Sequence, residues 1–167
     1  CPSASNQYDF EGELGVVIGR GGRRITPDRA LSHVAGYTCF FDGSVRDYQK
    51  HSFTAGKNFD SSGACGPWLV PAAEVPDPQN LKLTTRLNGE VVQQDSTAAM
   101  MLSVAEIIAY ISIFTHLEPG DVIATGTPAG VGAGRKPPLW LKPGDKVEVE
   151  IERIGVLANT VIPEPSV

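Results

Sequence analysis

Polar and apolar residues alternate from Tyr8 to Arg20, and this alternation predicts a β-strand with two different faces. One face carries Asp9, Glu11 and Glu13, whereas the opposite face is apolar. Because neighbouring carboxylates repel one another and lose hydration on an apolar strand, we expect a compensating charge, and a divalent cation is the simplest candidate. The alternative is the solvated face of an edge strand. The residues that continue the acidic face argue against this alternative because they are small or apolar: Gly15, Val17 and Gly19.

Short elements are predicted after this strand. Residues 26–36 begin with Thr-Pro, which is typical of a helix start, so we expect a short helix that ends near the glycine at position 36. Residues 37–41 are aromatic and apolar, and they predict a buried strand that ends at Asp42. A capping-box pattern that starts at Ser44 predicts a helical turn immediately afterwards.

The second half of the chain contains clearer patterns. Residues 51–71 lack periodicity and predict a long loop, whereas residues 81–94 alternate around an Asn-Gly pair and predict a β-hairpin. Ser103 opens a capping box and an apolar stripe of helical spacing, which predicts the one long helix. Residues 146–152 predict a half-exposed strand. Together with 18 Gly and 13 Pro, these patterns favour a β-rich architecture with many tight turns.

Composition restricts the possible partners and the cellular compartment. A length of 167 residues predicts a single domain, and a net charge of −5 without a basic run excludes nucleic acid as a partner. No apolar run approaches the ~20 residues that a membrane span needs. Three separated cysteines without a CxxC pair favour a reducing, cytoplasmic setting. Because the acidic strand follows almost directly after Cys1, we expect the parent protein to have an N-terminal segment that is missing here.

A second group of polar residues follows the aromatic strand. Asp42 lies at the strand's end, and Arg46 and Gln49 lie three residues apart on the next turn, where they share a face. A carboxylate, a guanidinium and an amide in this order can hold a metal and an anionic ligand together. The alternative for Arg46 is a surface ion pair with Asp47. Lys57 is surrounded by apolar and small residues, which can draw a lysine into a site.

Four motifs occur in this chain in a fixed order. They are YDFEGELGVVIGR at residues 8–20, FFDGSVRDYQ at 40–49, FTAGKNFD at 53–60 and ATGTPAGVG at 124–132. The glycines of the last motif allow backbone N–H groups to approach an anion. This set resembles the fumarylacetoacetate hydrolase family, over nearly the whole chain. The resemblance implies an α+β class, a β-rich mixed-sheet fold of the family's C-terminal catalytic domain, and a homodimer.

The resemblance also implies a set of functional residues. A divalent cation, Mg²⁺ with Mn²⁺ or Ca²⁺ as alternatives, is expected on three carboxylates, and hard oxygen ligands suit these ions. The implied ligands are Glu11, Glu13 and Asp42. The implied substrate contacts are Arg46, Gln49, Lys57 and Thr127, with catalytic roles for Lys57 and Arg46. Asp9 matches no ligand of the family.

The activity implied by the resemblance is metal-dependent chemistry on 2-oxo or 1,3-dicarbonyl acids, whose carboxylate and keto oxygens can chelate one metal. We expect C–C bond hydrolysis of the fumarylacetoacetate or acylpyruvate type, in the catabolism of aromatic compounds. Isomerisation, decarboxylation or hydration is the alternative, as is a non-catalytic metal and oxo-acid binder. Many hydrolytic members carry a histidine on a lid upstream of the acidic strand. His33, His51 and His116 match no such context. Two alternatives follow: the parent protein has a catalytic lid before Cys1, or this form binds metal and oxo acid without efficient turnover.

Overall fold

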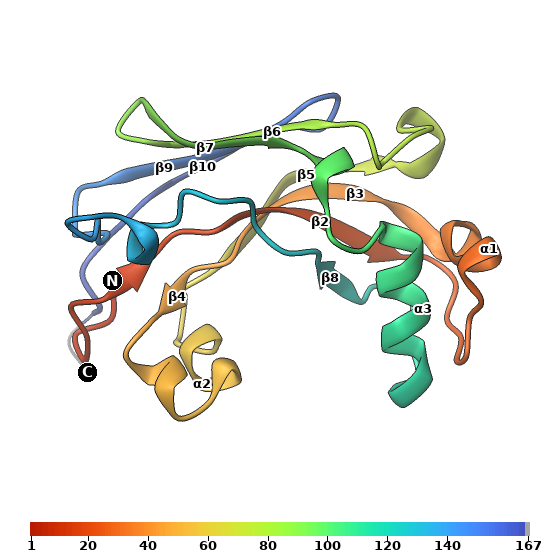
Figure 1. The fold of residues 1–167 in the computed structure, drawn as a ribbon, viewed down its shortest axis with the longest axis horizontal. Helices are drawn as coiled ribbons and strands as arrows, with labels where there is room; N and C mark the ends of the chain where they lie inside the picture. Colours follow the sequence, from red (N-terminus) through yellow and green to blue (C-terminus); the bar gives the residue numbers. More distant parts are fainter. Residues whose placement is uncertain (166–167) are drawn as a thin grey trace.

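The computed structural model describes residues 1–165, and its centre consists of two four-stranded antiparallel sheets (Figure 1). The first sheet has the strand order β5-β3-β2-β8, with Ala64–Pro71 (β5), Val34–Phe41 (β3), Gly12–Ile18 (β2) and Val122–Ala124 (β8). The second has the order β10-β9-β6-β7, with Gly155–Thr160 (β10), Lys146–Ile151 (β9), Lys82–Leu87 (β6) and Glu90–Ser96 (β7). A small ribbon pairs Tyr8–Asp9 (β1) with Ser44–Val45 (β4).

The main core lies where the two sheets face each other. β6 and β9 lie against β2, and β9 and β10 lie against β3. Side chains that alternate along the strands fill this space, and they include Leu14, Val16 and Ile18 from β2 and Val149 and Ile151 from β9, all buried. The apolar face predicted for β2 is therefore part of the core, and the acidic residues lie on the strand's other face.

Within residues 1–165, three α-helices complete the fold: Pro27–Ala30 (α1), Phe53–Lys57 (α2) and Val104–Phe114 (α3). The predicted capping box of α3 is confirmed, since the Ser103 hydroxyl accepts from the Glu106 N–H at 3.2 Å and Glu106 accepts from the Ser103 N–H at 2.7 Å. α3 lies against α1, and in Figure 1 α2 and α3 project below the central strands at separate ends. None of the helices between residues 1 and 165 has the length and apolar sequence needed to span a bilayer.

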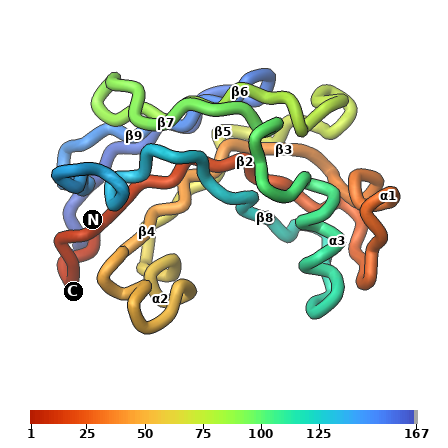
Figure 2. The backbone as a smooth tube through the Cα atoms, viewed as in Figure 1, coloured from red at the N-terminus to blue at the C-terminus, as the bar shows by residue number. Residues whose placement is uncertain are grey.

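The two ends of the described chain lie side by side (Figure 2). The Cys1 ammonium group donates to the Ile162 carbonyl at 2.5 Å, and the Ser3 N–H donates to the Glu164 carboxylate at 2.7 Å. The segment that leads into β1 is therefore fixed by the segment that follows β10.

The first strand differs from the prediction. Instead of one strand over residues 8–20, the chain forms β1 and β2 with a break after Asp9, because the Phe10 N–H donates to the Asp9 carboxylate at 2.8 Å rather than to a neighbouring strand. The predicted helical turn at Ser44 is wrong. Ser44 belongs to β4, its hydroxyl donates to the Asp42 carbonyl, and a 3₁₀ turn forms only at Tyr48–Lys50.

The long loop predicted for residues 51–71 is also wrong. This segment contains α2, which Ser52 caps by accepting from the Ala55 N–H, and β5, which pairs with β3. The helix predicted for residues 26–36 is shorter than expected, because Val34 already pairs with Ile18 in the sheet. The hairpin, the long helix and the strand near residue 146 are confirmed, as is the β-rich α+β class. β10 was not predicted.

Candidate metal centre

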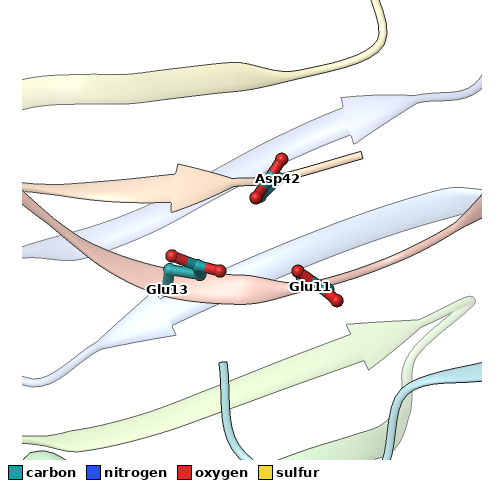
Figure 3. Close-up of side chains that lie close together, drawn as sticks. All are labelled: Glu11, Glu13 and Asp42. Carbon is teal, nitrogen blue, oxygen red and sulfur yellow. The ribbon is translucent and has the colours of Figure 1, made fainter. Parts of the chain in front are cut away.

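Three carboxylates from two neighbouring strands lie close together (Figure 3). β2 pairs with β3 so that Gly12 lies opposite Phe41, and the Asp42 N–H donates to the Glu11 carbonyl at 2.9 Å. This register places Asp42 beside both Glu11 and Glu13. One oxygen from each carboxylate lies within 4.8 Å of the other two, so the three predicted ligands form one cluster.

The positive charges beside the cluster are distributed unevenly. The Lys57 ammonium donates to Glu11 at 2.5 Å and also to Asp42, and the Arg46 guanidinium donates to Glu11 at 2.5 Å. Glu13, only 3% exposed, pairs with no cation among residues 1–165, and its partner is the Gly126 N–H at 2.7 Å. Glu11 thus has two cationic partners, whereas Glu13 has a single backbone donor.

This arrangement shifts the acidity of the carboxylates and their partners. Burial raises the pKa of Glu13 to about 7, and the nearby Asp42 and Glu11 add to this effect against the opposing hydrogen bond from Gly126. Burial also raises the pKa of Asp42, although Lys57 opposes the shift. For Lys57, burial favours the neutral amine, but hydrogen bonds to Asp42 and Glu11 outweigh this and raise its pKa. Lys57 therefore stays an ammonium ion at neutral pH.

The donor set fits a hard divalent cation. Each of the three carboxylates offers one oxygen to the cluster, and carboxylate oxygens are the ligands that Mg²⁺, Mn²⁺ and Ca²⁺ prefer. A buried glutamate without a cationic partner is costly when charged, and a bound cation would remove that cost. Glu11, Glu13 and Asp42 could therefore hold such an ion, with Lys57 and Arg46 at its edge.

Arg46 and Gln49 lie together, as their spacing predicted. The Arg46 Nη1 group donates to the Gln49 side-chain oxygen at 3.1 Å. The alternative predicted for Arg46, a surface ion pair with Asp47, is wrong. Asp47 accepts instead from the Ser5 hydroxyl at 2.6 Å, and Arg46 pairs with carboxylates of the site. The Gln49 amide nitrogen is buried and finds no hydrogen-bond partner within the described part of the chain, so it retains a donor for a ligand.

Thr127 lies on the glycine-containing turn, but its hydroxyl has structural partners. It donates to the Gly12 carbonyl at 2.9 Å and accepts from the Gln93 amide at 2.9 Å. This attaches the turn to β2 between two of the predicted metal ligands. A direct contact of Thr127 with substrate stays a prediction.

Two residues of this region were missed by the sequence reasoning. Gln93 is 2% exposed and joins β2 to the turn, since its oxygen accepts from the Gly12 N–H and its amide donates to Thr127 and to the Pro128 carbonyl. In the sequence it is one polar residue in a hairpin strand, with no signal of burial. Asp9, which matched no ligand, is 0% exposed and pairs with Arg46 at 2.8 Å.

The histidines lie outside the cluster, as expected. His33 is buried and its Nδ1 lies 2.7 Å from the Arg20 carbonyl, which agrees with a structural role. His51 and His116 are exposed. None of the three belongs to the carboxylate cluster, where Lys57 donates to Glu11.

An apolar cavity of about 530 Å³ lies beside the Thr125–Pro128 turn. Its lining includes Leu14, Met100 and Tyr110, from β2, the segment before α3 and α3 itself. The turn that donates to Glu13 thus also forms part of this cavity's wall.

Comparisons with known proteins agree with the fold. The family model described as fumarylacetoacetate (FAA) hydrolase C-terminal matches residues 1–162. The human protein named oxaloacetate tautomerase FAHD2A, mitochondrial, is 47% identical over 165 residues, which is 96% of this chain and 52% of the relative. This chain therefore spans about half the length of the curated relatives it matches.

Two solved structures are similar over nearly the whole chain. Fumarylacetoacetate hydrolase from Exiguobacterium antarcticum is 46% identical with a TM-score of 0.92, and the match covers 96% of this chain and 58% of that one. Fumarylpyruvate hydrolase from Pseudomonas aeruginosa, solved in complex with Mn²⁺ and pyruvate, is 35% identical with a TM-score of 0.89, and the match covers 98% and 70%. A protein of this fold thus binds a divalent cation and a 2-oxo acid.

Proposed function

Because this chain belongs to the fumarylacetoacetate hydrolase family, we propose that it is the metal-binding core of an enzyme that acts on 2-oxo or 1,3-dicarbonyl acids. The observation that carries the proposal is the cluster of three carboxylates with Lys57 and Arg46 beside it. A bound divalent cation supplies positive charge at the keto oxygen of an oxo acid and so lowers the cost of forming its enolate. Mn²⁺ is the first candidate, from the solved relative, and Mg²⁺ and Ca²⁺ are the others.

Each basic residue has a separate part in this proposal. Arg46 and the free amide donor of Gln49 bind the carboxylate of the oxo acid, since a guanidinium and an amide suit such a group. Lys57 is held as an ammonium ion, so it provides positive charge or a proton at a developing oxyanion and does not act as a free-amine base.

The preferred reaction is keto–enol tautomerisation of a short oxo diacid. This reaction moves one proton between carbon and oxygen and needs no activated water, so carboxylates and an ammonium group provide suitable acid–base chemistry. The relative at 47% identity carries the name oxaloacetate tautomerase, which favours this choice. The C–C bond hydrolysis expected from the sequence is the second candidate, because solved relatives are named as fumarylacetoacetate and fumarylpyruvate hydrolases.

The proposed reaction is tested with the Mn²⁺-loaded chain. We expect faster loss of the ultraviolet absorbance of enol-oxaloacetate, and replacement of Lys57 by Met should lower that rate at least about 100-fold. The matched control is Lys50→Met, an exposed lysine nearby, which should change little. Acylpyruvate cleavage without tautomerisation would select hydrolysis, and absence of both reactions would contradict the proposal.

The homodimer and the cytoplasmic setting stay proposals. In favour of a dimer, α3 exposes Tyr110, Ile113 and Phe114, each at least 60% exposed, and large apolar patches mark interaction surfaces. A molar mass of twice 17.8 kDa in light scattering would support the dimer. The human relative is mitochondrial by its name, so the compartment of this protein requires its own measurement.

A further inference from the structure

Asp9 is buried in a cradle of four N–H groups. It is 0% exposed, and each of its oxygens accepts two hydrogen bonds. One oxygen accepts from the Phe10 and Gly132 N–H groups at 2.8 and 2.7 Å, and the other from the Ala133 N–H and the Arg46 Nε at 2.9 and 2.8 Å. Three backbone donors and a guanidinium thus compensate the buried charge.

The cradle is built for a carboxylate and has no room for another ligand. A Cβ atom on Gly132 would lie 1.8 Å from the Leu139 carbonyl oxygen and 2.6 Å from the Asp9 carboxylate, so only glycine lets this N–H approach so closely. All the usual acceptor positions of the Asp9 carboxylate are filled. Asp9 also lies outside the group of oxygens that could hold a cation.

Arg46 is the residue through which Asp9 reaches the site. Its Nε donates to Asp9, one Nη2 hydrogen donates to Glu11, and one Nη1 hydrogen donates to Gln49. A guanidinium has five N–H groups, so one hydrogen remains on each terminal nitrogen. Each terminal nitrogen therefore keeps one donor that a carboxylate ligand can use.

We propose that Asp9 is a positioning residue that sets the orientation of Arg46 for an incoming carboxylate. Because Asp9 also holds the Gly132–Ala133 backbone, it joins Arg46 to the segment that follows the glycine-containing turn. The inference rests on the proposed function, in which Arg46 binds the carboxylate of an oxo acid. Without the Asp9 charge, the Nε group loses its charge-assisted acceptor, and the guanidinium is held less firmly and can turn towards Glu11.

The test compares two affinities in Asp9→Asn, with oxalate as an unreactive probe. Oxalate should bind about tenfold more weakly to the Mn²⁺-loaded variant, because a charge-assisted hydrogen bond that orients Arg46 is lost. The Mn²⁺ affinity itself should change less than about threefold, because Asp9 is not a ligand. The control is Asp60→Asn, at an exposed position in the loop after α2, which should change neither affinity. Equal losses in both affinities would overturn the positioning role, as would unchanged oxalate binding.

A double-mutant cycle distinguishes positioning from general support of the fold. If Asp9 acts through Arg46, then Asp9→Asn should weaken oxalate binding no further once Arg46→Lys is present. Additive losses would instead mean that Asp9 acts independently of Arg46, which contradicts the inference.

A spectroscopic readout tests the same contact without metal or ligand. The Arg46 Nε–H, assigned by its loss in Arg46→Lys, should give a sharp, slowly exchanging NMR signal in the wild-type chain and exchange faster in Asp9→Asn. A fast-exchanging signal in the wild type would overturn the inference. If Mn²⁺-loaded wild type fails to bind oxalate while this signal behaves as expected, the proposed function fails and the positioning of Arg46 by Asp9 stands.

Discussion

Glu13 is the residue whose chemistry defines the site. It is buried on the acidic face of β2, it has one backbone donor, and its pKa is raised to about 7 by burial and by the other two carboxylates. The metal-free folded chain therefore holds a proton on Glu13 at pH values where the unfolded chain has already lost it. Burial of Glu13 in its charged form costs stability, and a cation would recover that stability.

The first prediction concerns the stability of the metal-free chain. The pKa of Glu13 rises from 4.5 to about 7 on folding. The contribution of Glu13 to the stability of the folded chain is therefore most favourable below pH 4.5 and is lost as the pH rises through about 7. Glu13→Gln keeps an acceptor for the Gly126 N–H without the charge. At about pH 8 this variant should be more stable than the wild type by on the order of 2 kcal/mol in denaturant unfolding.

The same variant should bind Mn²⁺ far more weakly, so its stabilisation by Mn²⁺ should disappear. Glu90→Gln, at an exposed position of β7, is the matched control and should follow the wild type in both measurements. A metal-free Glu13→Gln chain that is less stable than the wild type near pH 8 would contradict the raised pKa of Glu13.

The second prediction is a pH dependence of metal affinity. Because Glu13 must lose its proton to bind a cation, the Mn²⁺ affinity should fall by up to roughly tenfold for each pH unit below about 7. Calorimetry in buffers of different protonation enthalpy should detect a proton released on binding near pH 6 and almost none near pH 8. A constant affinity and no proton release across this range would refute the prediction.

The sequence predicted some residues of the site for clear physical reasons. The period-two alternation placed Glu11 and Glu13 on one face of a strand, and a strand end supplied Asp42. Asp9 shares the same alternation, but no local pattern indicates that three donors from distant segments surround it. The role of Gln93 likewise depends on contacts with Gly12 and Thr127, which form only when β2 and the glycine-containing turn come together.

At the scale of elements, the corner between β3 and β4 places Asp42 beside β2 and Arg46 beside Asp9. Gly43 forms this corner, and a Cβ atom there would lie 1.7 Å from the Ser62 backbone oxygen and 2.7 Å from the Tyr8 hydroxyl. Tyr8 also donates to that same Ser62 oxygen at 2.7 Å. The corner is therefore packed so closely that it tolerates only glycine.

The third prediction follows from this packing. Gly43→Ala should destabilise the chain by about 1–3 kcal/mol, because the Ser62 backbone must move, and it should weaken Mn²⁺ binding by displacing Asp42. Thermal unfolding and metal titration measure the two effects. Gly134→Ala is the control, since its nearest neighbour would be a side-chain carbon at 3.9 Å. Equal behaviour of the two variants would show that the corner does not depend on Gly43.

Elements with strong local signals were predicted, and those that depend on distant partners were not. The hairpin of β6 and β7 contains an Asn-Gly turn, and α3 has a capping box, so both follow from neighbouring residues. β5 lacks regular alternation and exists because it pairs with β3, and β4 exists because it pairs with β1. β1 and β2 are separate strands because the Phe10 N–H donates to the Asp9 side chain and not to a neighbouring strand.

At the scale of the whole molecule, the site combines segments that are far apart in the sequence. Glu13 meets Gly126, Asp9 meets Gly132, and Glu11 meets Lys57, and these contacts form only when the distant segments come together. A cation bound at Glu11, Glu13 and Asp42 would therefore stabilise the folded chain as a whole.

The most direct test of this account is a calorimetric titration of oxalate into the chain with and without Mn²⁺. We predict a single Mn²⁺ per chain that requires Glu13, and oxalate binding only when that Mn²⁺ is present. Oxalate affinity that is independent of Mn²⁺, or Mn²⁺ affinity that is unchanged in Glu13→Gln, would contradict the central claim that the three carboxylates hold the cation on which an oxo acid binds.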